Sequence, residues 1–151
     1  MSESKKTEGL LLQEQRLIRQ LNNMDDELEQ LDYLLACAGE MPQMPEEKKT
    51  DENLISGCQA RVWVDVTVRK ECVWLQMECG SQVIRGVLAL FWKLLDGRSC
   101  REILEYQMHL IEDTDIRFLL SADRFHGMEK VISRIRERAA AGCGKIYAEQ
   151  K

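Results

Sequence analysis

The chain has 151 residues and a formal net charge of −5, with 21 Lys and Arg against 26 Asp and Glu. An acidic chain without a basic, aromatic-rich run would be repelled by a phosphate backbone, so we expect no nucleic-acid partner. The longest apolar run, residues 87–92, is too short to cross a bilayer, and the charged N-terminus lacks the apolar stretch of a secretory signal. We therefore expect no membrane partner and a cytoplasmic location.

This length fits one domain with a real hydrophobic core. We predict a single domain over residues 1–151, with flexible tails at 1–9 and 143–151. The six cysteines are spread singly, with no Cys-x-x-Cys pair. In a cytoplasmic protein they should be reduced, so their even number predicts no disulfide framework, and their spacing predicts no metal site.

A leucine stripe at helical spacing marks the N-terminal region. Between residues 10 and 38 apolar side chains recur every three or four positions, which predicts one long helix or two helices with a break at Asn22-Asn23. Gly39 is the expected helix end. The connector over residues 40–53 holds both prolines of the chain and many charges, which favours an extended surface segment.

Alternation of apolar and polar residues then predicts the sheet. Residues 61–69 and 73–79 are expected to form two antiparallel strands joined at 70–72, with a further short strand at 54–56. Cys58 follows that short segment, beside Gly57, where an open loop would suit exchange chemistry better than core filling. A buried and chemically inert Cys58 is the simpler alternative.

The remainder of the chain has helical patterns. Ser81 is an expected N-cap of a central buried helix, and Ser99 and Glu102 have the spacing of a capping box. A short helical segment is expected near 113–120, and a last helix over 125–141 that Gly142 stops. In that last helix the expected outward-facing arginines are Arg134, Arg136 and Arg138. Helices before and after a small antiparallel sheet of about three strands make an α+β two-layer domain.

No catalytic dyad or phosphate-binding loop is visible. The only histidines, His109 and His126, are distant in sequence from Cys58, so a Cys-His protease fits poorly. The glycines do not have a dinucleotide-binding or P-loop spacing. We predict no cofactor and no metal bound by the chain itself. The protein would be a cluster scaffold if three of its cysteines converged on an iron–sulfur cluster, and we keep this as an alternative. The three are Cys58, Cys79 and Cys100.

Several short motifs occur in one order over about residues 28–140. They are Met44-Pro45-Glu46-Glu47, Glu52-Asn53, Gly57-Cys58-Gln59, Val62-Trp63, Val83-Ile84-Arg85-Gly86 and Leu120-Ser121-Ala122-Asp123-Arg124. In this combination the chain resembles the SufE/CsdE family of sulfur-acceptor proteins. Three places depart from the family pattern: residues 78–82 replace a more acidic segment, Arg85 replaces a lysine, and Arg61 stands where a small residue is common. These departures make the partner and its docking harder to infer than the fold.

The resemblance implies a SufE/NifU-like fold and a role in iron–sulfur cluster assembly. Cys58 matches the family's persulfide acceptor, which takes sulfur from a SufS- or CsdA-like cysteine desulfurase, stimulates that enzyme and relays sulfur to a SufBCD-like scaffold complex. Gly57 and Gln59 match the rest of the acceptor loop. Arg124 matches a family arginine that would help dock the partner or favour the thiolate, although a surface charge on the last helix is an equal alternative.

The same resemblance implies an accessory protein rather than a stand-alone enzyme. The pyridoxal phosphate would belong to the desulfurase, and the carrier is expected to be a monomer or weak dimer. Two rival interpretations remain: an iron–sulfur scaffold that uses several cysteines, and a non-catalytic interaction domain in which Cys58 is only a core residue.

Overall fold

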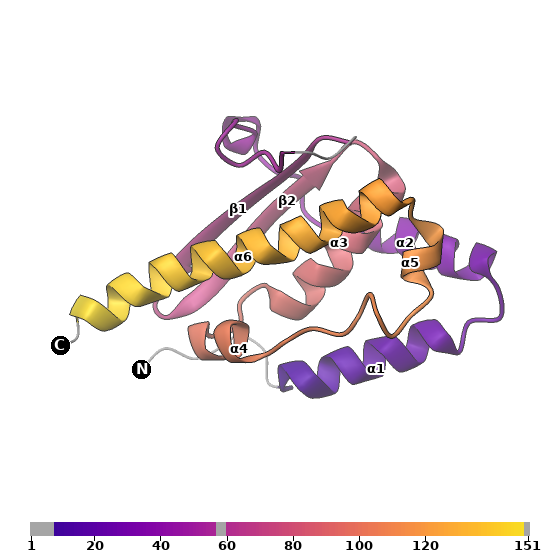
Figure 1. Cartoon of the computed structure of the whole chain (residues 1–151), viewed down its shortest axis with the longest axis horizontal. Coiled ribbons are helices and arrows are strands. Elements are labelled where there is room, and N and C mark those ends of the chain that lie inside the picture. The colour runs from indigo at the N-terminus through magenta and orange to yellow at the C-terminus, as the bar shows by residue number, and fades with distance from the viewer. Residues whose placement is uncertain (1–7, 57–59, 150–151) are drawn as a thin grey trace.

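The computed structural model describes residues 8–56 and 60–149 (Figure 1). In chain order its elements are α1 (Leu10–Asn22), α2 (Glu27–Glu40), a 3-10 turn (Glu46–Lys48), β1 (Val62–Arg69), β2 (Cys72–Cys79), α3 (Gln82–Leu95), α4 (Cys100–Glu105), α5 (Ile116–Leu119) and α6 (Ala122–Glu149). This is the predicted α+β class. No helix of the described ranges is both long and apolar enough to span a membrane.

The sheet is an antiparallel hairpin of β1 and β2, in which Val62 lies opposite Cys79 and Arg69 opposite Cys72. Lys70 and Glu71 form the turn with φ values of 51° and 63°, as a two-residue hairpin turn with left-handed backbone at both positions requires. The expected third strand at 54–56 is reduced, within the described residues, to a bridge between Leu54 and Trp63.

Two helices pack against the hairpin: α6 runs along β1 (Figure 1), and α3 contacts β2. The predicted central helix is confirmed, because α3 is buried over most of its length and begins at Ser81, whose hydroxyl accepts a hydrogen bond from the Ile84 N–H. On its other side α3 packs against α2, and Gly86 allows the approach. A Cβ on Gly86 would lie 2.8 Å from the carbonyl carbon of Leu34 and closer still to its oxygen.

The N-terminal leucine stripe forms two helices, so the second of the two predicted alternatives is confirmed. After α1 the chain bends, and Asp26 caps α2 by accepting a hydrogen bond from the Glu29 N–H at 2.9 Å. Gly39 does not end α2, since the helix includes Glu40. Not every leucine of α1 and α2 belongs to the core: the side chains of Leu11, Leu12 and Leu28 are exposed.

The last helix differs most from the prediction. Gly142 does not stop α6, which continues to Glu149 through the segment predicted to be a flexible tail. The glycine is there for another reason: a Cβ at this position would lie 2.5 Å from Cγ2 of Val68, so only glycine lets α6 lie this close to β1. The close contact with β1, and not a helix end, therefore explains the glycine at position 142.

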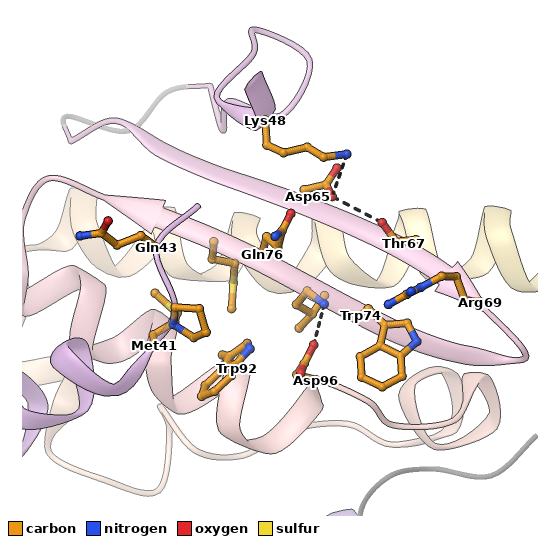
Figure 2. A pocket seen from close by; sticks show the side chains of 13 residues that line it. Met41, Gln43, Lys48, Asp65, Thr67, Arg69, Trp74, Gln76, Trp92 and Asp96 are labelled. Carbon is orange, nitrogen blue, oxygen red and sulfur yellow. Dashed lines mark hydrogen bonds and ion pairs between the residues drawn. The ribbon is translucent and has the colours of Figure 1, made fainter. Parts of the chain in front are cut away.

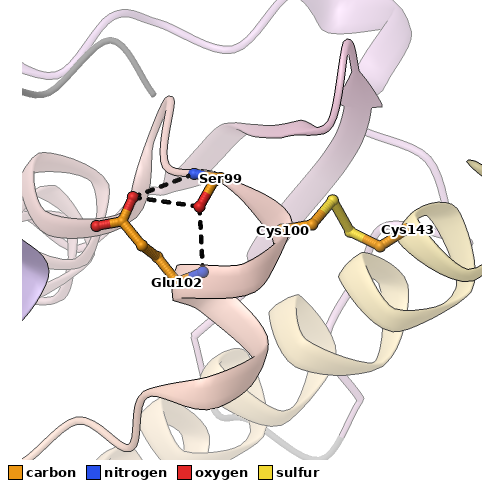
Figure 3. The surroundings of a disulfide bond; sticks show 4 residues. All are labelled: Ser99, Cys100, Glu102 and Cys143. Carbon is orange, nitrogen blue, oxygen red and sulfur yellow. Dashed lines mark hydrogen bonds between the residues drawn. A yellow bond between two sulfur atoms is a disulfide. The ribbon is translucent and has the colours of Figure 1, made fainter. Parts of the chain in front are cut away.

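The expectation that all six cysteines are reduced is also wrong. Cys100 at the start of α4 and Cys143 in α6 form a disulfide, shown in Figure 3 beside the predicted capping box of Ser99 and Glu102. Both cysteines are buried, and the bond joins α4 to α6 across a sequence separation of 43 residues. Among the described residues Cys37, Cys72 and Cys79 are buried and take part in no disulfide.

Candidate functional site

The predicted acceptor loop of Gly57, Cys58 and Gln59 lies outside the described residues. Its two ends are described: Ser56 precedes the loop and Ala60 follows it. The candidate site is therefore built from residues 52–56, which lead to Cys58 and which we call the acceptor segment, and from the helix that contacts this segment.

Three cations of α6 bind the backbone that leads to the loop. Lys130, Arg134 and Arg138 are spaced four residues apart, so they share one face of the helix, and we call them the cation ladder. Lys130 Nζ donates a hydrogen bond to the carbonyl oxygen of Ser56 at 3.1 Å. Arg134 donates to the carbonyl oxygen of Leu54 at 3.4 Å. The ladder thus reaches to within two residues of Cys58.

The C-terminal part of the ladder, Arg134 and Arg138, binds Glu52 and Asn53. Arg138 donates to the Glu52 carbonyl oxygen at 2.5 Å and to Asn53 Oδ1 at 2.6 Å, and Arg134 adds a bond of 3.1 Å to the same Glu52 oxygen. Asn53 is buried, and its Nδ2 donates to the Lys48 carbonyl oxygen at 2.8 Å. Its side chain therefore joins the connector to α6.

The opposite side of this segment pairs with β1. The Ile55 N–H donates to the Val62 carbonyl oxygen, and the Val64 N–H donates to the Asn53 carbonyl oxygen, both at 2.8 Å. The segment is thus held by backbone bonds to β1 on one side and by side-chain bonds from α6 on the other. Arginine donors are a good match for such carbonyls, because the guanidinium carries several N–H groups in a rigid fork.

Two hollows open on α6 beside Ser56. The smaller has a volume of about 180 Å³, and the larger about 430 Å³. Lys130 and Ser133 line both hollows, which therefore adjoin each other. In the larger one His126 Nδ1 lies 3.1 Å from Glu129 Oε1, and both side chains are exposed. This stretch of α6 forms a polar surface of mixed charge next to the acceptor segment.

Arg124 lies in the first turn of the same helix, and its side chain is partly exposed. Its backbone N–H donates to Ser121 Oγ at 3.3 Å, so Ser121 rather than Arg124 acts at the helix start. The role of Arg124 in docking the partner or favouring the thiolate stays a prediction.

The scaffold alternative needs Cys79 and Cys100 as cluster ligands together with Cys58. Cys79 is buried at the end of β2, and the sulfur of Cys100 is bonded to that of Cys143. In the part of the chain that the structure describes, no group of three or more His, Cys, Asp or Glu side chains is arranged to hold a metal ion.

Two of the departures from the family pattern, at Glu78 and Arg85, meet in one largely buried ion pair. Arg85 of α3 donates from Nε to Glu78 Oε2 at 2.5 Å, and its other donors reach the carbonyl oxygens of Ala38 and Met41. Glu78 also accepts from the Met44 N–H at 3.4 Å. Burial alone would raise the pKa of Glu78, but hydrogen bonds and charge from Arg85 hold this pKa below its ordinary value. The pair fastens the connector to α3.

A hollow of about 490 Å³ lies between the hairpin, the connector and α3 (Figure 2). Its charged side chains already have partners: Lys48 lies 3.8 Å from Asp65, Arg69 stacks over the Trp74 ring, and Asp96 accepts from a backbone N–H of β2. It shares no lining residue with the two hollows on α6. We therefore do not place the candidate functional site in this hollow.

The family model described as "SufE: Fe-S metabolism associated domain" matches residues 15–139. The chain belongs to the SufE family. The description of this model links the family to iron–sulfur metabolism. The match includes the motif around Cys58 and the whole cation ladder.

Two further likenesses agree with this family. The chain is 29% identical over 119 residues to the chloroplastic quinolinate synthase of Arabidopsis thaliana, covering 78% of this chain but only 17% of that protein. The solution structure of a hypothetical protein from Thermus thermophilus superposes with a TM-score of 0.73, covering 85% of this chain and 94% of that one. At 18% identity this second likeness shows the fold alone.

The helical pattern predicts Arg134 and Arg138 as solvent-facing charges, and it does not predict the cation ladder. Both side chains are partly buried against the acceptor segment. The available signal was the four-residue spacing of Lys130, Arg134 and Arg138, which puts three like charges on one helix face. Like charges at this spacing repel one another, so such a row points to acceptors whose hydrogen bonds offset the repulsion.

Proposed function

We propose that this SufE-family protein carries sulfur on Cys58. In this proposal Cys58 accepts persulfide sulfur from a SufS- or CsdA-like cysteine desulfurase, stimulates that enzyme and relays the sulfur to a SufBCD-like scaffold complex for iron–sulfur cluster assembly. The observation that carries the proposal is the family match over residues 15–139, which spans the Gly57-Cys58-Gln59 motif. The anchored segment before Cys58 supports it.

The chemistry is a thiol–disulfide type exchange. The Cys58 thiolate attacks the outer sulfur of a cysteine persulfide on the desulfurase, the sulfur–sulfur bond breaks, and its electron pair leaves with the desulfurase cysteine as a thiolate. Cys58 becomes a persulfide, and no external oxidant or reductant is needed. The pyridoxal phosphate that produces the first persulfide belongs to the desulfurase, so the carrier supplies only a thiolate in the right place.

The remaining parts of the proposal follow from this role. The protein acts as an accessory to the desulfurase rather than as a stand-alone enzyme, in the cytoplasm, as a monomer or weak dimer. Arg124 lies in the first turn of α6, the helix that carries the cation ladder, so we expect the desulfurase to bind near the N-terminal end of α6.

Stimulation of a cysteine desulfurase tests the proposal. Adding the wild-type protein to a desulfurase with cysteine should raise the rate of alanine production. With Cys58→Ser the increase in this rate should be at least tenfold smaller, because serine cannot form a persulfide. Cys79→Ala removes another thiol that is in no disulfide and serves as the control, with stimulation close to wild type. Equal stimulation by the wild type and by Cys58→Ser would contradict the proposal.

A further inference from the structure

The cation ladder and the acceptor segment match in length. A helix rises about 1.5 Å per residue and an extended chain about 3.3 Å, so four helical residues span nearly the same distance as two extended ones. The contacts follow this ratio: Ser56 pairs with Lys130 and Leu54 with Arg134. The segment therefore runs antiparallel to α6 in a fixed register.

The ladder supplies bonds that regular structure does not supply here. Leu54 makes only an isolated bridge to β1, so the carbonyl oxygens of Glu52, Leu54 and Ser56 bond to side chains of α6. Charged donors make stronger hydrogen bonds than neutral ones, and each donor is fixed on a rigid helix. A shift of the segment along α6 would break several of these bonds at once.

We propose that Lys130, Arg134 and Arg138 are positioning residues for sulfur transfer. They set the register of residues 52–56, and through it the place from which Cys58 meets the persulfide of the desulfurase. This inference rests on the proposed function of Cys58. Transfer between two large proteins depends on such placement, because a misplacement of about 1 Å in a reacting group can lower a rate by about a hundredfold.

Arg136 provides a matched control on the same helix. It donates to the carbonyl oxygens of Tyr106 at 2.7 Å and of Leu104 at 3.2 Å, so it makes the same kind of bonds to a different loop. Replacing Arg136 by methionine removes two arginine-to-carbonyl bonds, as replacing Arg134 does, but leaves the acceptor segment in place. A purely structural contribution should therefore affect both variants alike.

The experiment measures single-turnover sulfur transfer from a persulfide-loaded desulfurase to saturating carrier. Arg134→Met should transfer at least tenfold more slowly than the wild type, Arg134→Lys should recover part of the rate, and Arg136→Met should stay within about twofold. Lys130→Met should also be slow, and because the Lys130 side chain is exposed this variant should fold even if Arg134→Met does not. Alkylation of Cys58 by iodoacetamide, followed on its peptide by mass spectrometry, should change by less than about twofold, because a small reagent needs no docking.

Three outcomes would overturn this inference. One is an equal loss of rate in Arg134→Met and Arg136→Met. Another is that the ladder variants keep the wild-type transfer rate at saturating carrier but need a higher carrier concentration to reach half of that rate. This result would make the ladder a docking surface. The third is a parallel loss of alkylation, which would mean that the ladder alters the thiol itself. Failure of the wild type to gain sulfur would instead overturn the proposed function.

Discussion

Replacing Arg85 by methionine is expected to lower the free energy of unfolding by about 3–5 kcal/mol, the usual cost of removing one partner of a buried ion pair. Arg85 and Glu78 have side chains only 8% and 13% exposed. The substitution leaves the Glu78 carboxylate buried without its counter-ion, and it frees the carbonyl oxygens of Ala38, Met41 and Pro42 from their donor. Urea unfolding at pH 7 measures the loss.

An exposed pair gives the control for Arg85. Arg101 lies 3.5 Å from Glu105 in an ion pair whose side chains are 81% and 70% exposed, so Arg101→Met should change stability by no more than about 0.5 kcal/mol. A similar loss in both variants would contradict a special role of the Arg85–Glu78 pair.

The pH dependence of this difference follows from the pKa of Glu78. In the wild type Arg85 holds this pKa below the ordinary value of 4.5, so the pair stabilises the fold above about pH 4.5 and loses that contribution as the pH falls further. In Arg85→Met burial alone should raise the pKa of Glu78, so protonation relieves the unpaired charge at a higher pH. The stability gap between the two proteins should therefore narrow from pH 7 to pH 4, and a constant gap would mean that the loss comes from the carbonyl bonds.

Replacing Gly86 by alanine should destabilise the protein by about 3 kcal/mol, near the upper end of the usual cost of overpacking a core. The new methyl group would lie 2.8 Å from the carbonyl carbon of Leu34, and backbone in the middle of α2 cannot move aside as a flexible side chain can. α2 and α3 would have to separate along their whole contact. Thermal and urea unfolding measure the effect.

Gly39 is the matched control for Gly86, since it also lies in a helix but has nothing within 4 Å of the Cβ position. Gly39→Ala should stabilise the protein by up to about 1 kcal/mol, because alanine has the better helix propensity. If Gly86→Ala were as well tolerated as Gly39→Ala, the close approach of α2 to α3 would be wrong.

Local sequence signals predicted most elements correctly. The side-chain caps at Ser81 and Ser99 mark helix starts because a hydroxyl must accept the first free N–H groups, a requirement that involves only neighbouring residues. The alternation of valines in β1 marks its buried face for the same local reason. Motifs in one order then pointed to the family, which the match over residues 15–139 confirms.

Apart from the helix end expected at Gly39, the main differences from the sequence predictions concern contacts between residues far apart in the chain. Gly142 has the local signature of a helix end, but its neighbour Val68 decides its role. Cys143 belongs to no local motif, and its pairing with Cys100 depends on how α6 lies on α4. The same holds for Arg134, whose partners are 80 and 82 positions away in the sequence. The fold sets such contacts, so a residue pattern can at most place the side chains on one helix face and cannot name their partners.

Intact-protein mass spectrometry tests the central claim most directly. After incubation with a cysteine desulfurase, its cofactor and cysteine, the wild-type protein should gain about 32 Da, the mass of one sulfur atom, and the added sulfur should map to the peptide that contains Cys58. Cys58→Ser should gain nothing under the same conditions. Equal gains by the two proteins, or sulfur mapped to Cys37, Cys72 or Cys79, would contradict the assignment of Cys58 as the acceptor.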